Sequence, residues 1–315
     1  LKKGALETDI KSLKKAARQT IGPELEKRVQ SIIDTGLISL NEDFKIYWND
    51  FPIAKLSVGN NYLNPNFDLI VDDIIDLNPK QKLNEYISKW LNSKINSVLK
   101  SLVDLKNIKE NNSSIKALAY QLYENNGVLK REQVSEYLKN LEQNERRILR
   151  ELGVKFGRYH VFLHQLIKPE AVSLRTLLWK NFHQKYHNLK PPIFGLNFIE
   201  DKSFKNRNFM LLCGFENFDR FFVRIDILER LFLLIINSNS KEKNDIKIIP
   251  EMLNLLGCNK ENFKKLLKKM NYKVFEKENE TYFKYNPVSK LKKPQIKKIS
   301  AENPFGILKN LNLNN

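Results

Sequence analysis

The sequence predicts a mainly α-helical protein with short β-hairpins. Two patterns carry this prediction: apolar residues recur every three or four positions over long stretches, and short alternating segments are bounded by turn-forming residues. Hydrophobic residues make up 42% and aromatic residues 10% of the 315 positions, so the chain can bury substantial cores. This length suits two or three modest domains or one large one.

The amino-terminal part of the chain is predicted to be helical with one early hairpin. Residues 9–34 carry a helical periodicity that a Gly-Pro pair interrupts, which indicates two short helices or a kinked pair. The segments 44–48 and 53–58 alternate as strands do and are joined by a short turn. We expect the Asn, Gly and Pro residues over 59–66 to end this hairpin.

Three helices are predicted next. A long amphipathic helix covers 79–106, and two further helices cover 115–125 and 132–152. The polar stretch 107–114 has two interpretations. It is either a domain boundary or a loop that joins antiparallel helices.

An extended segment and one more helix complete this first part. Residues 154–163 form an extended segment interrupted by glycine, and a helix that starts with proline covers 169–188. The two consecutive prolines that follow Lys190 forbid helix continuation. We therefore predict a domain boundary there, with residues 1–190 as a helical accessory scaffold.

Residues 191–285 are predicted to form a second part that combines hairpins and helices. The segments 209–215 and 221–225 are predicted as a hairpin, followed by a helix over 226–237. Two helices and two extended segments come next, at 250–256, 260–270, 272–277 and 281–285. Helices closed by a hairpin in this way have the order of a winged helix, so we predict a winged-helix-like module. A basic tail with a short apolar end is predicted for 286–315.

The charge balance predicts a polyanionic partner. The chain carries 54 Lys and Arg against 36 Asp and Glu, a net charge of +18, which is typical of proteins that bind nucleic acid. A second interpretation stays open, because lysine greatly outnumbers arginine and asparagine and isoleucine are abundant. An AT-rich genome produces the same bias, so in this interpretation part of the positive charge reflects compositional drift and not binding.

The predicted helix 260–270 has the strongest nucleic-acid signal. Its apolar positions fall on one side, namely Phe263, Leu266, Leu267 and Met270. Its lysines fall on the other side, namely Lys264, Lys265, Lys268 and Lys269. Lysines without Arg, Asn or Gln partners contact phosphates and read few bases, so binding should tolerate any sequence. The alternative is an ordinary solvated helix face.

Further basic residues are predicted to contact nucleic acid. Lys273 follows the lysine-rich helix, and the tail contributes Lys290, Lys292, Lys293, Lys297 and Lys298. Lys155 and Arg158 lie beside Tyr159 in the extended segment, where a cationic and aromatic set can clamp a single strand. The competing interpretation places Tyr159 and Phe162 in the core.

No catalytic or metal site is predicted. A phosphate loop of the form G-x-x-x-x-G-K-[S/T] and an acidic ATPase box are both missing, so the chain as given should not hydrolyse ATP. The histidines form two i, i+4 pairs, His160/His164 and His183/His187, without the Glu or Cys companions of a zinc site. The two cysteines stand in apolar surroundings and are expected to be reduced thiols.

We expect a cytoplasmic protein without membrane contact. No apolar run approaches the about 18 to 20 residues that span a bilayer, and the amino terminus lacks the apolar core of a signal peptide. The first residue is Leu1 rather than methionine, which is consistent with a piece of a longer protein.

Four stretches together resemble one known family. They are SSIKALAYQLYENNGVLKREQV (113–134), LGVKFGRYHVFLHQLIKPEAVSLRTLLW (152–179), FMLLCGFENFDRFFVRIDILERL (209–231) and AENPFGILKNL (301–311). In this order they resemble the region after the motor in alphaproteobacterial superfamily 2 helicases, relatives of the mitochondrial RNA helicase of the degradosome. The resemblance covers the chain from about Phe44 to the end. It implies that motor domains using ATP and Mg²⁺ lie upstream, and that this chain holds no cofactor.

Charge and resemblance together predict a non-catalytic accessory region of an ATP-dependent helicase. Its role would be to contact nucleic acid nonspecifically and to brace the missing motor domains, and kinship with RNA helicases favours RNA over DNA. A rival hypothesis is a protein-interaction scaffold that recruits an RNA-decay enzyme without binding nucleic acid. A free-standing winged-helix regulator is disfavoured by the large remainder of the chain.

Overall fold

The fold is mixed rather than mainly α-helical. The computed structural model describes residues 22–70, 77–108, 113–201, 206–238 and 245–285. Of these residues 52% are helical and 24% lie in strands, which form four small antiparallel sheets. The predicted fold class is therefore wrong. Many strands are only three or four residues long, too short to show the alternation that identifies a strand in sequence.

The first sheet is larger than the predicted hairpin. A helix over 22–35 leads into four strands in sequential order, β1 (Ile38–Leu40), β2 (Lys45–Trp48), β3 (Phe51–Asn61) and β4 (Asn64–Leu69). The predicted hairpin corresponds to β2 and β3, but the stretch 59–66 carries the turn into β4 instead of ending the sheet. Helix α2 (Leu77–Val98) shares a core with this sheet through side chains at four-residue spacing, namely Leu83, Ile87, Leu91 and Ile95.

Three successive units then share one topology: a helix, a strand, one or two short helices and a β-hairpin. Helix α3 (Lys100–Lys106) leads to the first unit, which contains α4 (Ser113–Glu124), β5 (Val128–Lys130), α5 (Ser135–Asn140), α6 (Gln143–Glu151), β6 (Val154–Phe156) and β7 (His160–Leu163). The second unit contains α7 (Pro169–Phe182), β8 (Phe198–Glu200), α8 (Arg207–Leu212), β9 (Phe215–Phe218) and β10 (Phe221–Arg224). The third contains α9 (Ile225–Asn237), β11 (Ile246–Lys247), α10 (Pro250–Leu256), α11 (Lys260–Lys269), β12 (Tyr272–Lys277) and β13 (Glu280–Tyr285). In each unit the first strand pairs with the last, which gives the orders β5-β7-β6, β8-β10-β9 and β11-β13-β12.

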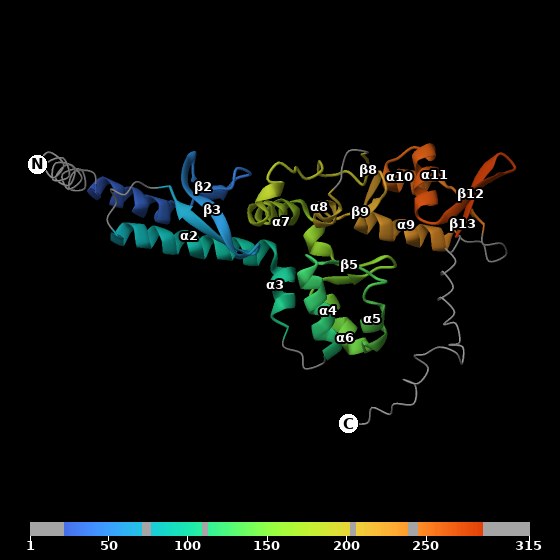
Figure 1. Ribbon diagram of the computed structural model, residues 1–315, viewed down its shortest axis with the longest axis horizontal. Helices are drawn as coiled ribbons and strands as arrows, with labels where there is room; N and C mark the ends of the chain where they lie inside the picture. The colour runs from blue at the N-terminus through green and yellow to red at the C-terminus, as the bar shows by residue number, and fades with distance from the viewer. Residues whose placement is uncertain (1–21, 71–76, 109–112, 202–205, 239–244, 286–315) are drawn as a thin grey trace, which may run out of the picture.

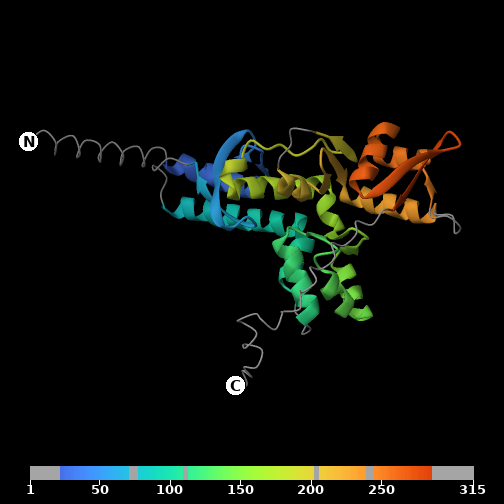
Figure 2. The same cartoon turned by 45° about the vertical axis from the view of Figure 1, so that its right-hand side comes forward.

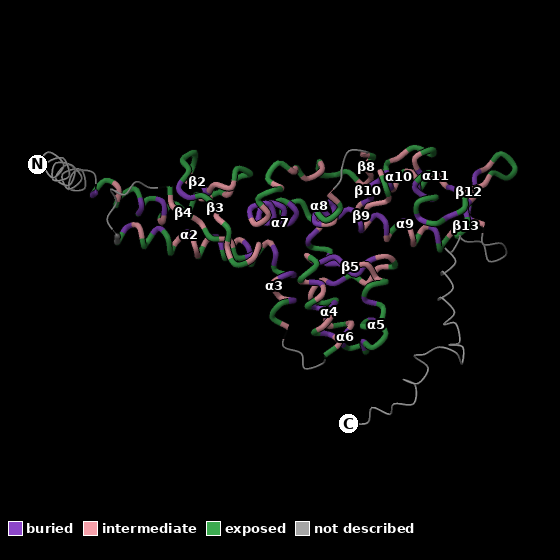
Figure 3. The backbone as a smooth tube through the Cα atoms, in the orientation of Figure 1, coloured by how far each residue is buried: buried purple, intermediate pink, exposed green. Residues whose placement is uncertain are grey.

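The units are arranged as a row with one lobe beneath it. Figure 1 shows α2 and the first sheet at one end, α7 in the middle and α9, α10 and α11 at the other end. The first unit, with α4, α5 and α6, forms the lobe beneath the row, and the view turned by 45° agrees (Figure 2). Figure 3 shows that burial is concentrated along α7, most of whose residues are buried. Within the described residues, no helix has both the length and the hydropathy to cross a bilayer.

Some predicted elements are confirmed and others are wrong. Helices α10 and α11 and the hairpin β12–β13 lie where they are predicted. The predicted helix 132–152 is divided into α5 and α6, because Leu141 between them is extended. The predicted strand 209–215 is mostly helix α8, whose cap Asn206 accepts a hydrogen bond from the Phe209 amide at 2.9 Å. The predicted boundary after Lys190 lies between α7 and β8, and the division into domains stays a prediction.

A buried arginine joins the first two units. Arg175 of α7 is fully buried, and its Nη1 donates to the carbonyl of Asn126 at 2.7 Å. Its Nη2 donates to the carbonyl of Leu166 at 3.1 Å and also to that of Leu212. The carbonyl of Asn126 follows α4, that of Leu166 lies in the turn before α7, and that of Leu212 ends α8. A buried charge costs free energy unless such bonds replace its hydration, so Arg175 fixes the three segments around it.

We expect the substitution Arg175→Met to lower the free energy of unfolding by about 3 to 5 kcal/mol, because three buried carbonyls lose their donor. Chemical denaturation measures this loss. The matched control is Arg147→Met, which removes a guanidinium that is 72% exposed and should change the unfolding free energy by less than about 0.5 kcal/mol. Equal effects of the two substitutions would show that the contacts of Arg175 do not stabilise the junction.

Candidate nucleic-acid interface

Helix α11 has the apolar and basic faces that the sequence predicts. The side chain of Asn259 caps its amino end by accepting a hydrogen bond from the Asn262 amide at 2.8 Å. The apolar side is buried in the core of the third unit, namely Phe263, Leu266, Leu267 and Met270. This burial fixes the direction in which the lysines of the opposite side project.

The four predicted lysines of α11 differ in their surroundings. Lys264 lies 3.2 Å from Glu276 and 3.4 Å from Glu261, and Lys269 lies 2.8 Å from Asp219. In contrast, Lys265 and Lys268 are exposed, and neither forms an ion pair in the described part of the chain. The two stand three residues apart, so they project from the same side of the helix. This pair is therefore open to a polyanion, as is the exposed Lys260 at the start of α11.

The hairpin after α11 adds a second pair of like charges. Lys273 of β12 lies directly opposite Lys284 of β13, and both side chains are exposed. Like charges at opposed positions of a hairpin repel each other. A phosphate near this pair would relieve the repulsion, so the site of the predicted Lys273 is suited to a polyanion.

Of the two basic residues predicted in the first unit, Arg158 lies against the third unit and Lys155 does not. Arg158, in the turn between β6 and β7, lies over the ring of Phe232 in α9 at 5.5 Å. Tyr159 packs its edge on the same ring, and its hydroxyl lies 3.2 Å from that of Tyr272 at the start of β12. Lys155 is exposed on β6, and no described contact joins it to the third unit. The predicted tail lysines lie outside the described residues.

A cleft of about 530 Å³ lies where this turn meets the third unit. Its basic side chains are Lys130, Arg131 and Arg158. Its aromatic side chains are Tyr159, Phe218, Phe232, Tyr272 and Tyr285. Phe162 is buried, whereas Tyr159 is half-buried, packs against the core of the third unit and also lines the cleft. The core interpretation therefore holds for Phe162 and in part for Tyr159. Rings beside guanidinium groups are suited to the bases and phosphates of a single strand.

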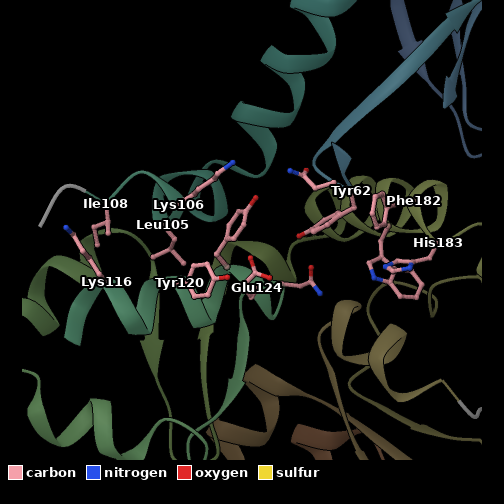
Figure 4. A pocket seen from close by; sticks show the side chains of 13 residues that line it. Tyr62, Leu105, Lys106, Ile108, Lys116, Tyr120, Glu124, Phe182 and His183 are labelled. Carbon is pink, nitrogen blue, oxygen red and sulfur yellow. The ribbon is translucent and has the colours of Figure 1, made fainter. Parts of the chain in front are cut away.

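A second cavity, of about 590 Å³, is also rich in rings (Figure 4). It is lined by aromatic side chains from the first sheet, α4 and α7, including Tyr62, Tyr120, Tyr123, Trp179 and Phe182. Figure 4 shows Tyr120, Lys106 and Lys116 on one side of it and Tyr62, Phe182 and His183 on the other. The Tyr62 hydroxyl is buried and has no hydrogen-bond partner in the described structure. Sequence reasoning missed this cavity because its walls come from segments more than 100 residues apart.

Comparison of the chain with protein-family models, with curated proteins and with solved structures found no match. The function must therefore be inferred from the geometry of the residues themselves.

A largely buried ionic cluster lines part of the first cleft. His160 Nε2 lies 2.8 Å from Glu216 and Nδ1 lies 3.5 Å from Glu229, while Arg207 and Lys130 approach Glu216 to 3.0 and 3.6 Å. Burial alone would lower the pKa of His160, but the two carboxylates outweigh burial and raise it. Burial would raise the pKa of Glu216, but the hydrogen bond and charge of His160, with the two cations, hold it below its ordinary value. The cluster therefore acts as a structural ion pair.

The other histidines and the cysteines do not join this cluster. His164 is exposed, while His183 packs on Trp179 and His187 stacks on Phe44. Burial raises the pKa of Cys213 to about 12 and that of Cys258 to about 11, so both thiols stay protonated at neutral pH. Among the described residues, no three His, Cys, Asp or Glu side chains converge as metal ligands would.

The carboxylate of Glu229 in α9 is held by the turn 157–160. It accepts hydrogen bonds from the amides of Tyr159 at 2.9 Å and His160 at 2.8 Å, and from that of Arg158. A Cβ at position 157 would stand 2.3 Å from the carboxylate carbon, so any larger residue there would displace the Glu229 carboxylate. The turn is therefore shaped to receive this carboxylate, which docks the third unit on the first.

We expect the substitutions Gly157→Ala and Glu229→Ala each to lower the free energy of unfolding by about 2 to 4 kcal/mol, because each removes the charge-assisted bonds of the turn. The double variant should lose little more than either single variant, since both remove the same interaction. Chemical denaturation of the four proteins measures this coupling. Gly22→Ala, where a Cβ meets open space, is the control that should add independently to Glu229→Ala. If the losses of unfolding free energy from Gly157→Ala and Glu229→Ala simply added in the double variant, the proposed role of the turn would be disproved.

The ionic cluster should make stability depend on pH. The folded state raises the pKa of His160 above its ordinary 6.5, so it binds this proton more tightly than the unfolded chain does. The resulting stabilisation is fully present below pH 6.5 and should be lost as the pH rises through the raised value. Denaturation midpoints measured from pH 5 to pH 9 (about the range needed to cover this loss) test it. The variant His160→Gln should lack this fall, and an unchanged pH profile in that variant would contradict the assignment.

Proposed function

We propose that the third unit is a winged-helix-like module that binds nucleic acid through α11 and the β12–β13 hairpin. The observation that carries this proposal is the exposed pair Lys265 and Lys268 on a helix whose opposite side is buried in the core of the unit. In helix-turn-helix proteins the second helix of the pair lies on the nucleic acid. Helix α11 has that position after α10, and the hairpin that follows it carries two further exposed lysines, Lys273 and Lys284.

The chemistry of these side chains favours contact with phosphates over recognition of bases. Ammonium groups act as point charges, and the exposed side of α11 offers no arginine. Binding is therefore nonspecific and weakens as salt rises. The two ring-lined cavities are suited to unpaired bases, which supports a single strand as the ligand.

The wider role rests on the resemblance to the region after the motor of superfamily 2 helicases. In this proposal the chain is a non-catalytic accessory region that guides a strand, with RNA favoured, and braces ATP-dependent motor domains in the cytoplasm. An RNA-decay enzyme is a further partner that the resemblance implies.

A protein-interaction scaffold is the second candidate function. The segment between α7 and β8 exposes three large apolar side chains close together, with Ile193 at 79%, Phe194 at 48% and Leu196 at 42% exposure. Such a patch is typical of a surface that contacts another protein. A chain that binds a partner through this segment and does not bind nucleic acid would fit the scaffold.

We expect wild-type protein to bind mixed-sequence single-stranded RNA in fluorescence anisotropy, with an affinity that falls steeply as salt rises. The double variant Lys265→Ala/Lys268→Ala should bind more weakly. It should also reduce the slope of log Kd against log salt by about 1.4, since each phosphate contact on a single strand contributes about 0.7.

The matched control is Lys82→Ala/Lys89→Ala, which removes two exposed lysines from one side of α2. It should leave the slope unchanged. Absence of binding by the wild-type chain at low salt would sink the proposal and favour the scaffold, and equal losses in both double variants would show that only the total charge matters.

A further inference from the structure

Helices α6 and α11 occupy the same position in the first and third units and end in the same way. Each is followed by a residue with positive φ, Gly153 at 92° and Asn271 at 65°. The next residue, Val154 or Tyr272, begins the hairpin. Since positive φ disfavours helix continuation, this residue gives a common reference point for the two helices.

Counted back from this point, the two helices share their apolar positions and three basic positions, and they differ at Glu151, which stands where α11 has Lys269. RRILREL (146–152) corresponds to KKLLKKM (264–270), and Lys155 after the turn corresponds to Lys273. The apolar positions of both segments belong to the hydrophobic cores of their own units. On this alignment Arg147 and Arg150 take the positions of Lys265 and Lys268.

The surroundings of these side chains repeat as well. Arg146 is held by hydrogen bonds to the carbonyls of Leu141 and Leu138, as its counterpart Lys264 is held by glutamates. Arg147 and Arg150 are exposed like their counterparts, although the Arg150 guanidinium also lies over the ring of Phe156 at 5.6 Å. Arg147 makes one ion pair, with Glu151 at 3.6 Å, which its counterpart Lys265 lacks among the described residues. Both side chains are mostly exposed, so this pair contributes little, as do the pairs of Lys264 and Lys269 with exposed acids.

The second unit does not keep this open face. Its helix α8 ends at Gly214, also with positive φ, and the corresponding positions are Asn208 and Leu211. Leu211 packs against a buried cluster of Val128, Phe162 and Ile225, which belong to the neighbouring units. The face that is basic in the first and third units is therefore covered at Leu211 in the second, while Asn208 stays exposed and uncharged.

The side chains of α6 differ from those of α11 in one chemical respect. Gln143 and Asn144 are exposed in the first turn, and Arg147 and Arg150 follow on the same side at helical spacing. Arginine pairs through two donors with guanine O6 and N7, and the amides pair with adenine. Lysine has no such fork.

We infer that α6 is a second nucleic-acid-binding helix, and that Arg147 and Arg150 give it a preference for guanine that α11 lacks. The inference extends the proposed function, on which it rests, from phosphate contact to selection of bases.

The test compares two labelled RNA strands of equal length, one with isolated guanines and one without guanine, bound to the full chain in anisotropy titrations. Wild-type protein should bind the guanine-containing strand about tenfold more tightly, the value of one good bidentate pair. Arg147→Ala/Arg150→Ala should lose this preference and reduce the salt slope by about 1.4. Arg147→Lys/Arg150→Lys should lose the preference and keep the slope, because the charge stays and the fork is removed.

The variant Lys265→Ala/Lys268→Ala separates this inference from the proposed function, because it should weaken binding to both RNA strands by the same factor. If Arg147→Ala/Arg150→Ala leaves both the affinity and the salt slope unchanged, the inference that α6 binds nucleic acid is overturned, whatever the lysine variant does. A guanine preference that survives in the lysine-for-arginine variant overturns base selection. Loss of binding in the arginine variants alone supports α6 and overturns the proposal for α11. Circular dichroism of every variant confirms that the fold is retained.

Discussion

The carboxylate of Glu229, held by the amides of the turn 157–160, is the contact on which the junction of the first and third units depends. A carboxylate that leaves water must regain its hydrogen bonds, and the turn supplies them from three successive amides. The same contact places Tyr159 beside Tyr272 and encloses His160 between two carboxylates. The cleft at this junction exists because the turn and α9 are joined there.

Arg175 has the opposite charge and the same kind of role. Its guanidinium collects carbonyls from segments around α7, as the turn collects a carboxylate from α9. Both the turn and Arg175 belong to the stretch 152–179, the longest of the stretches that carry the helicase resemblance. Its polar residues satisfy groups from neighbouring units, so this stretch has a structural explanation that requires no catalytic role.

Local signals explain which elements could be predicted from the sequence. Helix α11 and its hairpin were predictable because Asn259 caps the helix and the strands that follow alternate. Helix α8 was not, since its apolar run resembles a strand and its cap at Asn206 lies outside that run. Strands such as β5 and β11 exist only through pairing with distant segments. The lysine face was predictable from spacing. The ion pairs of Lys264 and Lys269 depend on residues that only folding brings together. The same holds for the exposure of Arg147.

The middle unit gives the chain a property that separate modules on flexible linkers would lack. Leu211 of α8 packs on residues of both neighbours, so the first and third units do not turn independently about the second. Figures 1 and 2 both place α6 and α11 in different lobes of this single body. The separation of the two basic helices is thus set by the packing of the protein interior. Under the proposed function, a strand must be long enough to bridge this separation before it can contact both helices, and a shorter strand could occupy only one of them.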